Sequence, residues 1–243
     1  MKLPFDGHFR RRLYLVRHGQ AAASQPGHGI YGDAISLTAA GRDEAQAMSD
    51  ALAGVPFEEA WCSDINRAQE TARVILAPHG LEVTASERFT EMRGDIAAAL
   101  KLDLPKEQKL GRFAYSMWQE QSGGRFFGGD DLRGYMDRVA TTLESLVLET
   151  TASNVLIVSH SGFQRAALCW VLDAVPLGLA KLEQDSCCLN ILDIDVSEHG
   201  EILRKHVRLA NYTPTDPVKI YNRLTDGERL AMRLSEQLEG RDV

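Results

Sequence analysis

The sequence has few of the features that mark a secreted or membrane protein. Its four cysteines have no CxxC spacing, and Cys187 and Cys188, as neighbours in a strand, would point to opposite faces. The basic triplet 10–12 precedes an apolar run of only about four residues, which is too short for a signal peptide or a membrane span. We therefore expect a reduced, cytoplasmic protein with no membrane partner.

Positive charge is also scarce, because 27 Lys and Arg residues face 34 Asp and Glu residues, for a net charge of −7. Binding to a nucleic-acid backbone needs a basic face, so a nucleic-acid partner is not expected and any anion site must be built locally. The 243 residues, 44% of them hydrophobic, suffice for one core without cross-links. We expect one domain, residues 1–243, and the sequence leaves its oligomeric state open.

Two apolar runs each end in a histidine that a glycine closely follows. The first run, 13–16, continues into Arg17-His18-Gly19, and the second, 154–159, continues into His160-Ser161-Gly162. Such runs predict buried strands, and glycine permits the sharp turn that presents a side chain at the sheet edge. If the two strands are parallel and adjacent, both imidazoles converge at the carboxyl edge, where α/β proteins bind ligands.

The remaining pattern alternates strands and helices. Between the first strand and Thr84 the order is strand, helix, strand, helix, strand, which favours an α/β layer fold. We predict a three-layer α/β/α sandwich with a mostly parallel central sheet, one antiparallel edge and an inserted cap at about residues 92–131. The predicted elements are helices at 38–52 (cap Thr38), 64–80 (cap Asp64), 131–148 (cap Asp130 or Asp131), 162–172 and 226–238, strands at 59–62 and 81–84, and a hairpin of 187–196 and 201–209.

Two further charged residues follow predicted strands. Arg67 lies just inside a helix start, where the helix dipole disfavours a cation. Either an anion binds there and offsets both charges, or the arginine is solvated. Glu91 follows the third strand at the entrance to the predicted cap, and by itself it could equally be a surface carboxylate.

A metal site is the alternative use of two convergent histidines. His18, His160 and nearby acidic residues could bind a cation, but two arginines beside them would repel it, and no HxH or HxxxH spacing is present. We expect no metal and no cofactor. The other histidines have no second signal and are expected to be structural or exposed: His8, His28, His79, His199 and His206.

Taken together and in this order, the segments resemble the histidine phosphatase superfamily, which includes the cofactor-dependent phosphoglycerate mutases. The resemblance rests on the Arg-His-Gly turn, the helix start at 37–41, the segment 63–72, Glu91 and the strand end at 159–162. It implies that His18 is the nucleophile and Glu91 the proton donor. Residues implied to line the phosphate pocket are Arg17, Arg67 and His160, with Gly19, Ser24 and Ser161 as further phosphate-binding residues.

The chemistry of phosphoryl transfer agrees with these roles. Its transition state spreads negative charge, so catalysis is mainly positioning and electrostatic stabilisation, which two arginines can supply by bidentate contacts. Nearby cations disfavour protonation of His18 and so keep it nucleophilic. His160, if protonated, would donate to the phosphoryl oxygens. Glu91 under a cap can hold a proton for the leaving group and later take one from water.

Two sequence features favour a phosphatase over a mutase. Phosphoglycerate mutases have an arginine directly after the catalytic glutamate and an arginine pair in the cap, whereas here Met92 follows Glu91 and the cap contains no adjacent arginine pair. We predict a phosphomonoesterase that acts on a small-molecule phosphate ester through a phosphohistidine at His18. The alternatives are a phosphoglycerate mutase-type phosphotransferase and a non-catalytic relative that binds phospho-ligands. The physiological substrate and the role of Asp130, in a Gly-Gly-Asp-Asp stretch, stay open.

Overall fold

The computed structural model describes residues 8–21, 34–94, 124–126, 129–221, 223–225 and 228–229. Ser24, most of the predicted cap and all but two residues of the predicted helix at 226–238 lie outside the described residues, so those predictions are not tested.

Six strands of the described chain form one mixed sheet in the order β3-β2-β4-β1-β5-β6. Neighbouring strands from β3 to β1 pair in parallel, whereas β5 is antiparallel to both β1 and β6. The predicted α/β fold with a parallel centre and an antiparallel edge is therefore confirmed. The strands are β1 (His8–Arg17), β2 (Glu59–Cys62), β3 (Thr84–Ala85), β4 (Asn154–Ser159), β5 (Leu189–Ser197) and β6 (Ile202–Tyr212).

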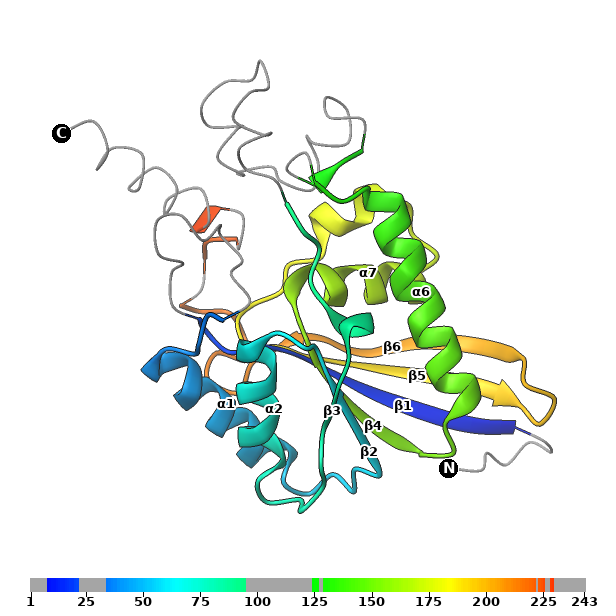
Figure 1. The fold of residues 1–243 in the computed structure, drawn as a ribbon, viewed down its shortest axis with the longest axis horizontal. Coiled ribbons are helices and arrows are strands. Elements are labelled where there is room, and N and C mark those ends of the chain that lie inside the picture. Colours follow the sequence, from blue (N-terminus) through cyan, green and yellow to red (C-terminus); the bar gives the residue numbers. More distant parts are fainter. Residues whose placement is uncertain are drawn as a thin grey trace.

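Helices cover the two faces of this sheet (Figure 1). Along β1, Leu13 and Leu15 pack with one helix pair, whereas Tyr14 and Val16 pack with the other. This alternation follows from the two-residue period of a strand, and it produces the three layers that the sequence predicted. The pairs are α1 (Ala39–Leu52) with α2 (Asn66–Leu76), and α6 (Leu132–Glu149) with α7 (Ser161–Val171). Within the described part of the chain, no helix is long and apolar enough to span a membrane.

Two of the three predicted helix caps are confirmed. Thr38 Oγ1 accepts a hydrogen bond from Gly41 N at 3.0 Å, and an Asp131 carboxylate oxygen accepts one from Gly134 N at 2.6 Å. The prediction of Asp64 as a cap was wrong, because α2 begins later, after Ile65, which makes no side-chain cap. Ser63 Oγ instead accepts a hydrogen bond from Ile65 N at 3.2 Å.

Strand β1 begins earlier than its apolar run indicates, and it includes the basic triplet. Arg10 Nε lies 2.7 Å from a carboxylate oxygen of Asp195, and Arg12 Nε lies 2.7 Å from one of Asp193. Both carboxylates are fully buried on β5. Ion pairs with β5 therefore stabilise the part of β1 that precedes its apolar run. Local sequence patterns do not reveal this effect, because the partners lie far away in the sequence.

The cysteines differ in one respect from the sequence-based expectation. All four are free and buried, but Cys187 and Cys188 precede β5 instead of lying in it, and Cys187 has a φ of 52°. The prediction that Cys187 and Cys188 point to opposite faces of a strand was therefore wrong. Burial raises the pKa of Cys62 to about 11 and that of Cys188 to about 12, so these thiols stay protonated and unreactive at neutral pH.

Candidate active site

His18 and His160 lie side by side at the carboxyl edge of the sheet. Strands β1 and β4 pair in parallel with Arg17 opposite Ser159, so the next residue of each strand is a histidine. The two ring centroids are 5.1 Å apart, and both rings are buried. The predicted convergence of the two histidines is confirmed.

The turn after β1 needs glycine because it packs against the start of α1. A Cβ at Gly19 would lie 2.4 Å from the carbonyl oxygen of Gly41, and a Cβ at Gly41 would lie 2.0 Å from that of Gln20. The backbone N–H of Gly19 donates to Thr71 Oγ1 at 3.1 Å. This close backbone packing holds the turn, and hence His18, at a set place over the sheet edge.

The hydrogen bonds of His18 define its tautomer. Its Nδ1 lies 2.7 Å from the carbonyl oxygen of Gly19, which can only accept, so Nδ1 carries the proton. Arg67 Nε donates to His18 Nε2 at 3.1 Å, so Nε2 presents a lone pair. Burial, together with the charges of Arg67 and Arg17, lowers the pKa of His18 well below 6.5. The ring is therefore neutral, with Nε2 as its nucleophilic atom.

Arg67 lies between the two imidazoles. It is the second residue of α2 and is only 4% exposed, so the alternative of a solvated arginine is wrong. Its Nη2 lies 3.4 Å from His160 Nδ1. A buried cation at a helix N-terminus, where the dipole opposes it, is stabilised by a bound anion.

His160 is turned toward a serine that sequence reasoning missed. Its Nε2 lies 2.9 Å from Ser63 Oγ, while its Nδ1 faces the donor group of Arg67, so the proton belongs on Nε2. Burial, the neighbouring His18 and the charges of Arg67 and Arg17 lower the pKa of His160 well below 6.5. The ring is therefore neutral, whereas its predicted donation to phosphate requires the protonated form.

Glu91 lies at the N-terminus of α7 and is 8% exposed, so it is not a surface carboxylate. Its Oε1 accepts hydrogen bonds from Met92 N at 2.9 Å and Gly162 N at 3.1 Å. Burial raises the pKa of Glu91 above its ordinary value of 4.5, and these hydrogen bonds and the arginine charges only partly oppose it. A Cβ at Gly162 would lie 2.4 Å from Oε1, so a larger residue there would displace the carboxylate.

The loop that carries Glu91 is held at both ends. Ser159 Oγ, at the end of β4, donates to the carbonyl oxygen of Phe89 at 2.6 Å. Beyond Glu91, a carboxylate oxygen of Asp130 accepts from Arg93 N at 2.8 Å, and Asp130 N donates to the carbonyl of Arg93 at 2.8 Å. Asp130 thus has a definite structural role, since it joins the glutamate loop to the start of α6.

Arg17 completes the cationic side of the site. Its Nη1 donates to the carbonyl oxygen of Gln184 at 2.6 Å, and its charge contributes to the lowered pKa of both histidines. Ser63 has a signal that sequence reasoning could have used, because it directly follows β2 just as the histidines follow their strands. Gln184 has no such signal, since it comes from a distant irregular segment.

Of the three other residues predicted to bind phosphate, two have hydrogen-bond partners within the protein and one lies outside the described residues. The N–H of Gly19 is bonded to Thr71, and Ser161 Oγ accepts from Arg165 Nε at 3.2 Å. Ser24 is outside the described residues. Their roles in phosphate binding stay predictions.

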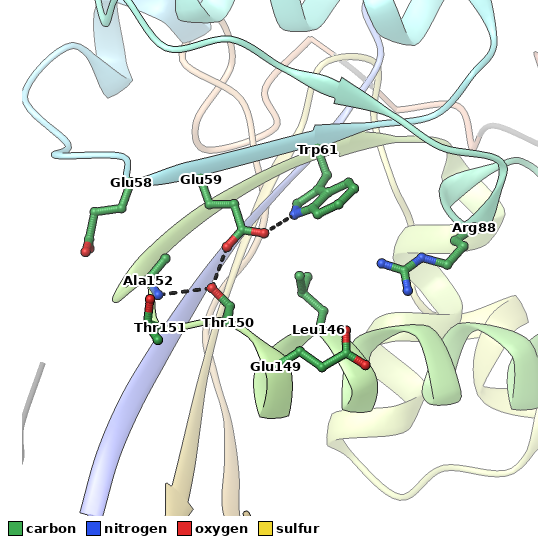
Figure 2. A pocket seen from close by; sticks show the side chains of 9 residues that line it. All are labelled: Glu58, Glu59, Trp61, Arg88, Leu146, Glu149, Thr150, Thr151 and Ala152. Atoms are coloured by element: carbon green, nitrogen blue, oxygen red, sulfur yellow. Dashed lines mark hydrogen bonds between the residues drawn. The ribbon is translucent and has the colours of Figure 1, made fainter.

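A cavity of about 410 Å³ lies where β2 and β4 begin, at the end of these strands opposite to the histidines (Figure 2). Its carboxylates are largely bound within the protein: Glu59 accepts from Trp61 Nε1 at 2.5 Å and from the Thr150 hydroxyl, and Glu58 accepts from Ser153 N at 2.9 Å. The histidine cluster is therefore the better candidate for chemistry. Among the described residues, no group of three or more His, Cys, Asp or Glu side chains is placed to hold a metal ion.

Comparison with known families agrees with this geometry. The family model of the histidine phosphatase superfamily (branch 1) matches residues 13–206, which is most of the chain. The chain belongs to the histidine phosphatase superfamily. The matched range contains all five residues of the cluster: Arg17, His18, Arg67, Glu91 and His160.

Individual relatives in the superfamily include both phosphatases and mutases. The chain is 28% identical to the adenosylcobalamin/alpha-ribazole phosphatase of Escherichia coli K12, over 76% of this chain and 90% of that protein. It is 29% identical to 2,3-bisphosphoglycerate-dependent phosphoglycerate mutase 2 of Gloeobacter violaceus, over 72% and 82%. The solved structure of a mycobacterial glucosyl-3-phosphoglycerate phosphatase has the same fold, with a TM-score of 0.66 and 21% identity over 83% of this chain and 99% of that one.

Proposed function

We propose that this member of the histidine phosphatase superfamily is a phosphomonoesterase that forms a phosphohistidine at His18. The observation that carries the proposal is the geometry of His18 Nε2. The Nδ1 hydrogen bond to the Gly19 carbonyl leaves the lone pair on Nε2, which lies 3.1 Å from Nε of the buried Arg67, and guanidinium groups bind phosphate well. A nucleophile and an anion-binding group thus meet at one point.

In the first step, His18 Nε2 attacks phosphorus and the ester P–O bond breaks. Arg17 and Arg67 stabilise the charge on the phosphoryl oxygens, and the contact from Arg67 to Nε2 is replaced by contacts to phosphate. Glu91 donates its proton to the leaving alkoxide. Its raised pKa supports this role, because a buried carboxyl group holds a proton at a higher pH than an exposed one does.

In the second step, water attacks the phosphohistidine. Glu91, now ionised, takes a proton from the water, the P–N bond breaks, and its electron pair returns to Nε2. Burial and the neighbouring charges favour neutral His160, but a bound phosphate dianion favours its protonated form. We assign it the stabilisation of the phosphoryl group, with Ser63 orienting its ring.

Met92 favours hydrolysis over transfer to a second hydroxyl. Phosphoglycerate mutases have an arginine at this position, directly after the catalytic glutamate, whereas Met92 is 1% exposed and packs in the core with Phe89 and Phe126. A buried thioether cannot bind the carboxylate of a phosphoglycerate. Water is then the acceptor that the site favours.

We infer a small-molecule phosphate ester as the substrate and a reducing compartment, such as the cytoplasm, as the location. The names of the relatives support the first inference, since they refer to alpha-ribazole and glucosyl-3-phosphoglycerate phosphatases. Four free, buried cysteines support the second.

Phosphate release from a panel of sugar phosphates, nucleotides, phosphoglycerates and phosphopeptides tests the proposal. We expect wild-type turnover of at least one small ester and none by His18→Ala. The matched control is His199→Ala, since His199 is exposed in the turn between β5 and β6 and should keep full activity. Undiminished turnover by His18→Ala would contradict the mechanism.

Trapping the intermediate separates the candidate activities. A quenched reaction with labelled substrate should contain an acid-labile, base-stable phosphoenzyme, as a phosphoramidate requires. Transfer from bisphosphoglycerate to monophosphoglycerate that exceeds hydrolysis would favour the mutase. Phosphate binding without turnover of any ester would favour a non-catalytic binding protein.

A further inference from the structure

Arg17 depends for its orientation on a segment without regular secondary structure. Residues 182–188 connect the 3₁₀ helix η3 (Pro176–Lys181) to β5, and we call them the η3–β5 segment. The guanidinium of Arg17 donates to the carbonyl oxygen of Gln184 at 2.6 Å, and its backbone N donates to that of Cys188 at 3.0 Å. The position of one proposed phosphate ligand therefore follows the position of this segment.

A buried arginine on α7 ties this part of the chain to the site helix. Arg165 is 2% exposed, and its Nη1 donates to the carbonyl oxygen of Leu179 at 2.8 Å. Its Nη2 forms an ion pair with Glu183 at 3.0 Å, and its Nε donates to Ser161 Oγ at 3.2 Å. The Arg165 guanidinium thus joins the first turn of α7 to η3 and to Glu183, the residue directly before Gln184.

The side chain of Gln184 is held as tightly as its backbone. It is 1% exposed, and its Oε1 accepts hydrogen bonds from Asn190 Nδ2 at 2.7 Å and Cys188 Sγ at 3.3 Å. Its Nε2 donates to the carbonyl oxygen of Glu183 at 2.7 Å. Asn190 also donates to Gln164 Oε1 on α7 at 2.8 Å, so a buried amide network links the segment to β5 and α7.

We propose that Gln184 and Arg165 are positioning residues for Arg17, an inference that rests on the proposed function. Apolar side chains of similar volume often stabilise a core as well as buried charged networks do, so stability does not require these polar groups. The orientation of Arg17 does require them, because displacing a residue that binds phosphate by about 1 Å can lower the rate about a hundredfold. The network holds the Gln184 carbonyl that accepts from the Arg17 guanidinium, whose charge acts on both histidines.

The substitution Gln184→Met tests this role, since methionine has a similar shape without the amide. We expect it to raise the dissociation constant for inorganic phosphate, measured by calorimetric titration, about tenfold and to lower kcat/KM by a similar factor. Arg165→Lys, which keeps the charge but not the rigid fork, should give a smaller effect of the same kind. It also serves as the milder variant if Gln184→Met does not fold.

The decisive measurement is a double-mutant cycle with Arg17→Ala. If Gln184 acts through Arg17, adding Gln184→Met to Arg17→Ala should change the phosphate dissociation constant by less than about twofold. A tenfold effect that persists without Arg17 would overturn the positioning role. Val196→Ala, a buried change at the far end of β5, controls for lost stability and should leave phosphate affinity unchanged.

Failure of the proposed function gives a different result. A folded wild-type protein that neither binds inorganic phosphate nor hydrolyses any ester of the panel overturns both the function and the positioning role. Wild-type activity with additive effects in the cycle overturns the positioning role alone.

Discussion

His18, His160 and Glu91 are buried ionisable side chains, and burial shifts each of them toward its neutral form. Arg17 and Arg67 remain charged, because a guanidinium is not deprotonated in proteins. At the scale of single residues, the site therefore combines two guanidinium charges with two neutral imidazoles and a carboxyl group whose pKa is raised. That combination suits a phosphate dianion and agrees with the roles proposed for His18 and Glu91.

The substitution Glu91→Gln should slow hydrolysis of alkyl phosphates by about 10²-fold to 10⁴-fold, because their alkoxide leaving groups need a proton. The loss should be much smaller for p-nitrophenyl phosphate, whose phenolate leaves unprotonated. In wild type, kcat/KM should fall as pH rises through the raised pKa of Glu91, and the variant should lack this decline. The measurement is a pH–rate profile with both esters.

The control for this prediction is Glu87→Gln, which changes an exposed carboxylate on the 3₁₀ helix η1 (Glu87–Phe89), near the same loop. It should leave both profiles unchanged. Equal losses for the two esters with Glu91→Gln would mean that Glu91 is not the proton donor.

Gly162→Ala should lower activity much more than stability. The new methyl group would lie 2.4 Å from Glu91 Oε1, the end of a flexible side chain, so the carboxylate moves away from Gly162 N and loses a hydrogen bond worth about 1 kcal/mol. Urea unfolding and the alkyl phosphate assay measure the two effects. Gly54→Ala is the matched control, since a Cβ there meets nothing within 4 Å, and it should change neither.

At the scale of elements, cross-strand ion pairs hold the antiparallel edge of the sheet to its centre. Arg10 and Arg12 of β1 each make bidentate contacts to a buried aspartate of β5. Burial would raise the pKa of Asp195, but the hydrogen bonds and charges of Arg10 and Arg204 outweigh it, and the pKa is lowered. These pairs extend β1 beyond its run of buried apolar residues, which begins at Leu13.

Asp193→Asn should therefore destabilise the protein by about 1–3 kcal/mol, because Arg12 loses the charge that compensates it. The effect stays moderate because the Arg12 side chain is 35% exposed. Urea unfolding measures it, and kcat should not change. Arg208→Gln removes a more distant contact to the same carboxylate, at 3.7 Å from a 60% exposed side chain, and should cost less than about 0.5 kcal/mol.

At the scale of the whole molecule, the buried histidines make folding depend on pH. His18 and His160 have a folded-state pKa well below the ordinary 6.5, so below about pH 6.5 the unfolded chain binds protons that the folded chain does not. Their contribution to stability is therefore lost as pH falls. Glu91, whose folded pKa is raised above 4.5, acts in the opposite direction from pH 4.5 up to that raised pKa.

We expect the free energy of unfolding to decrease below about pH 6.5, with each histidine contributing up to about 1.4 kcal/mol per pH unit. Urea unfolding between pH 5 and pH 7.5 measures this slope. His18→Gln should reduce the slope and Glu91→Gln should increase it. If wild type and His18→Gln have identical slopes, the pKa of His18 is not lowered on folding.

Much of the fold followed from local pattern. The apolar runs ending in His18 and His160, and the caps Thr38 and Asp131, all lie where the sequence predicted them, because hydrophobic period and capping depend on near neighbours. Asp64 was misassigned as a cap because α2 begins only at Asn66, after a turn in which Ser63 Oγ accepts from Ile65 N. The long β1 was missed because its polar half is stabilised by aspartates more than 180 residues away.

The sequence by itself determined which residues are proposed as the reacting groups: two histidines at strand ends, Arg67 at a helix start, and a glutamate in the third loop. Only the tertiary structure decided their states, because proton positions and pKa values depend on burial and on partners from distant segments. The Gly19 carbonyl and Arg67 set the tautomer of His18, Ser63 turns His160, and Gln184 directs Arg17. These side chains are desolvated, and their hydrogen bonds form, only once the distant segments are packed together.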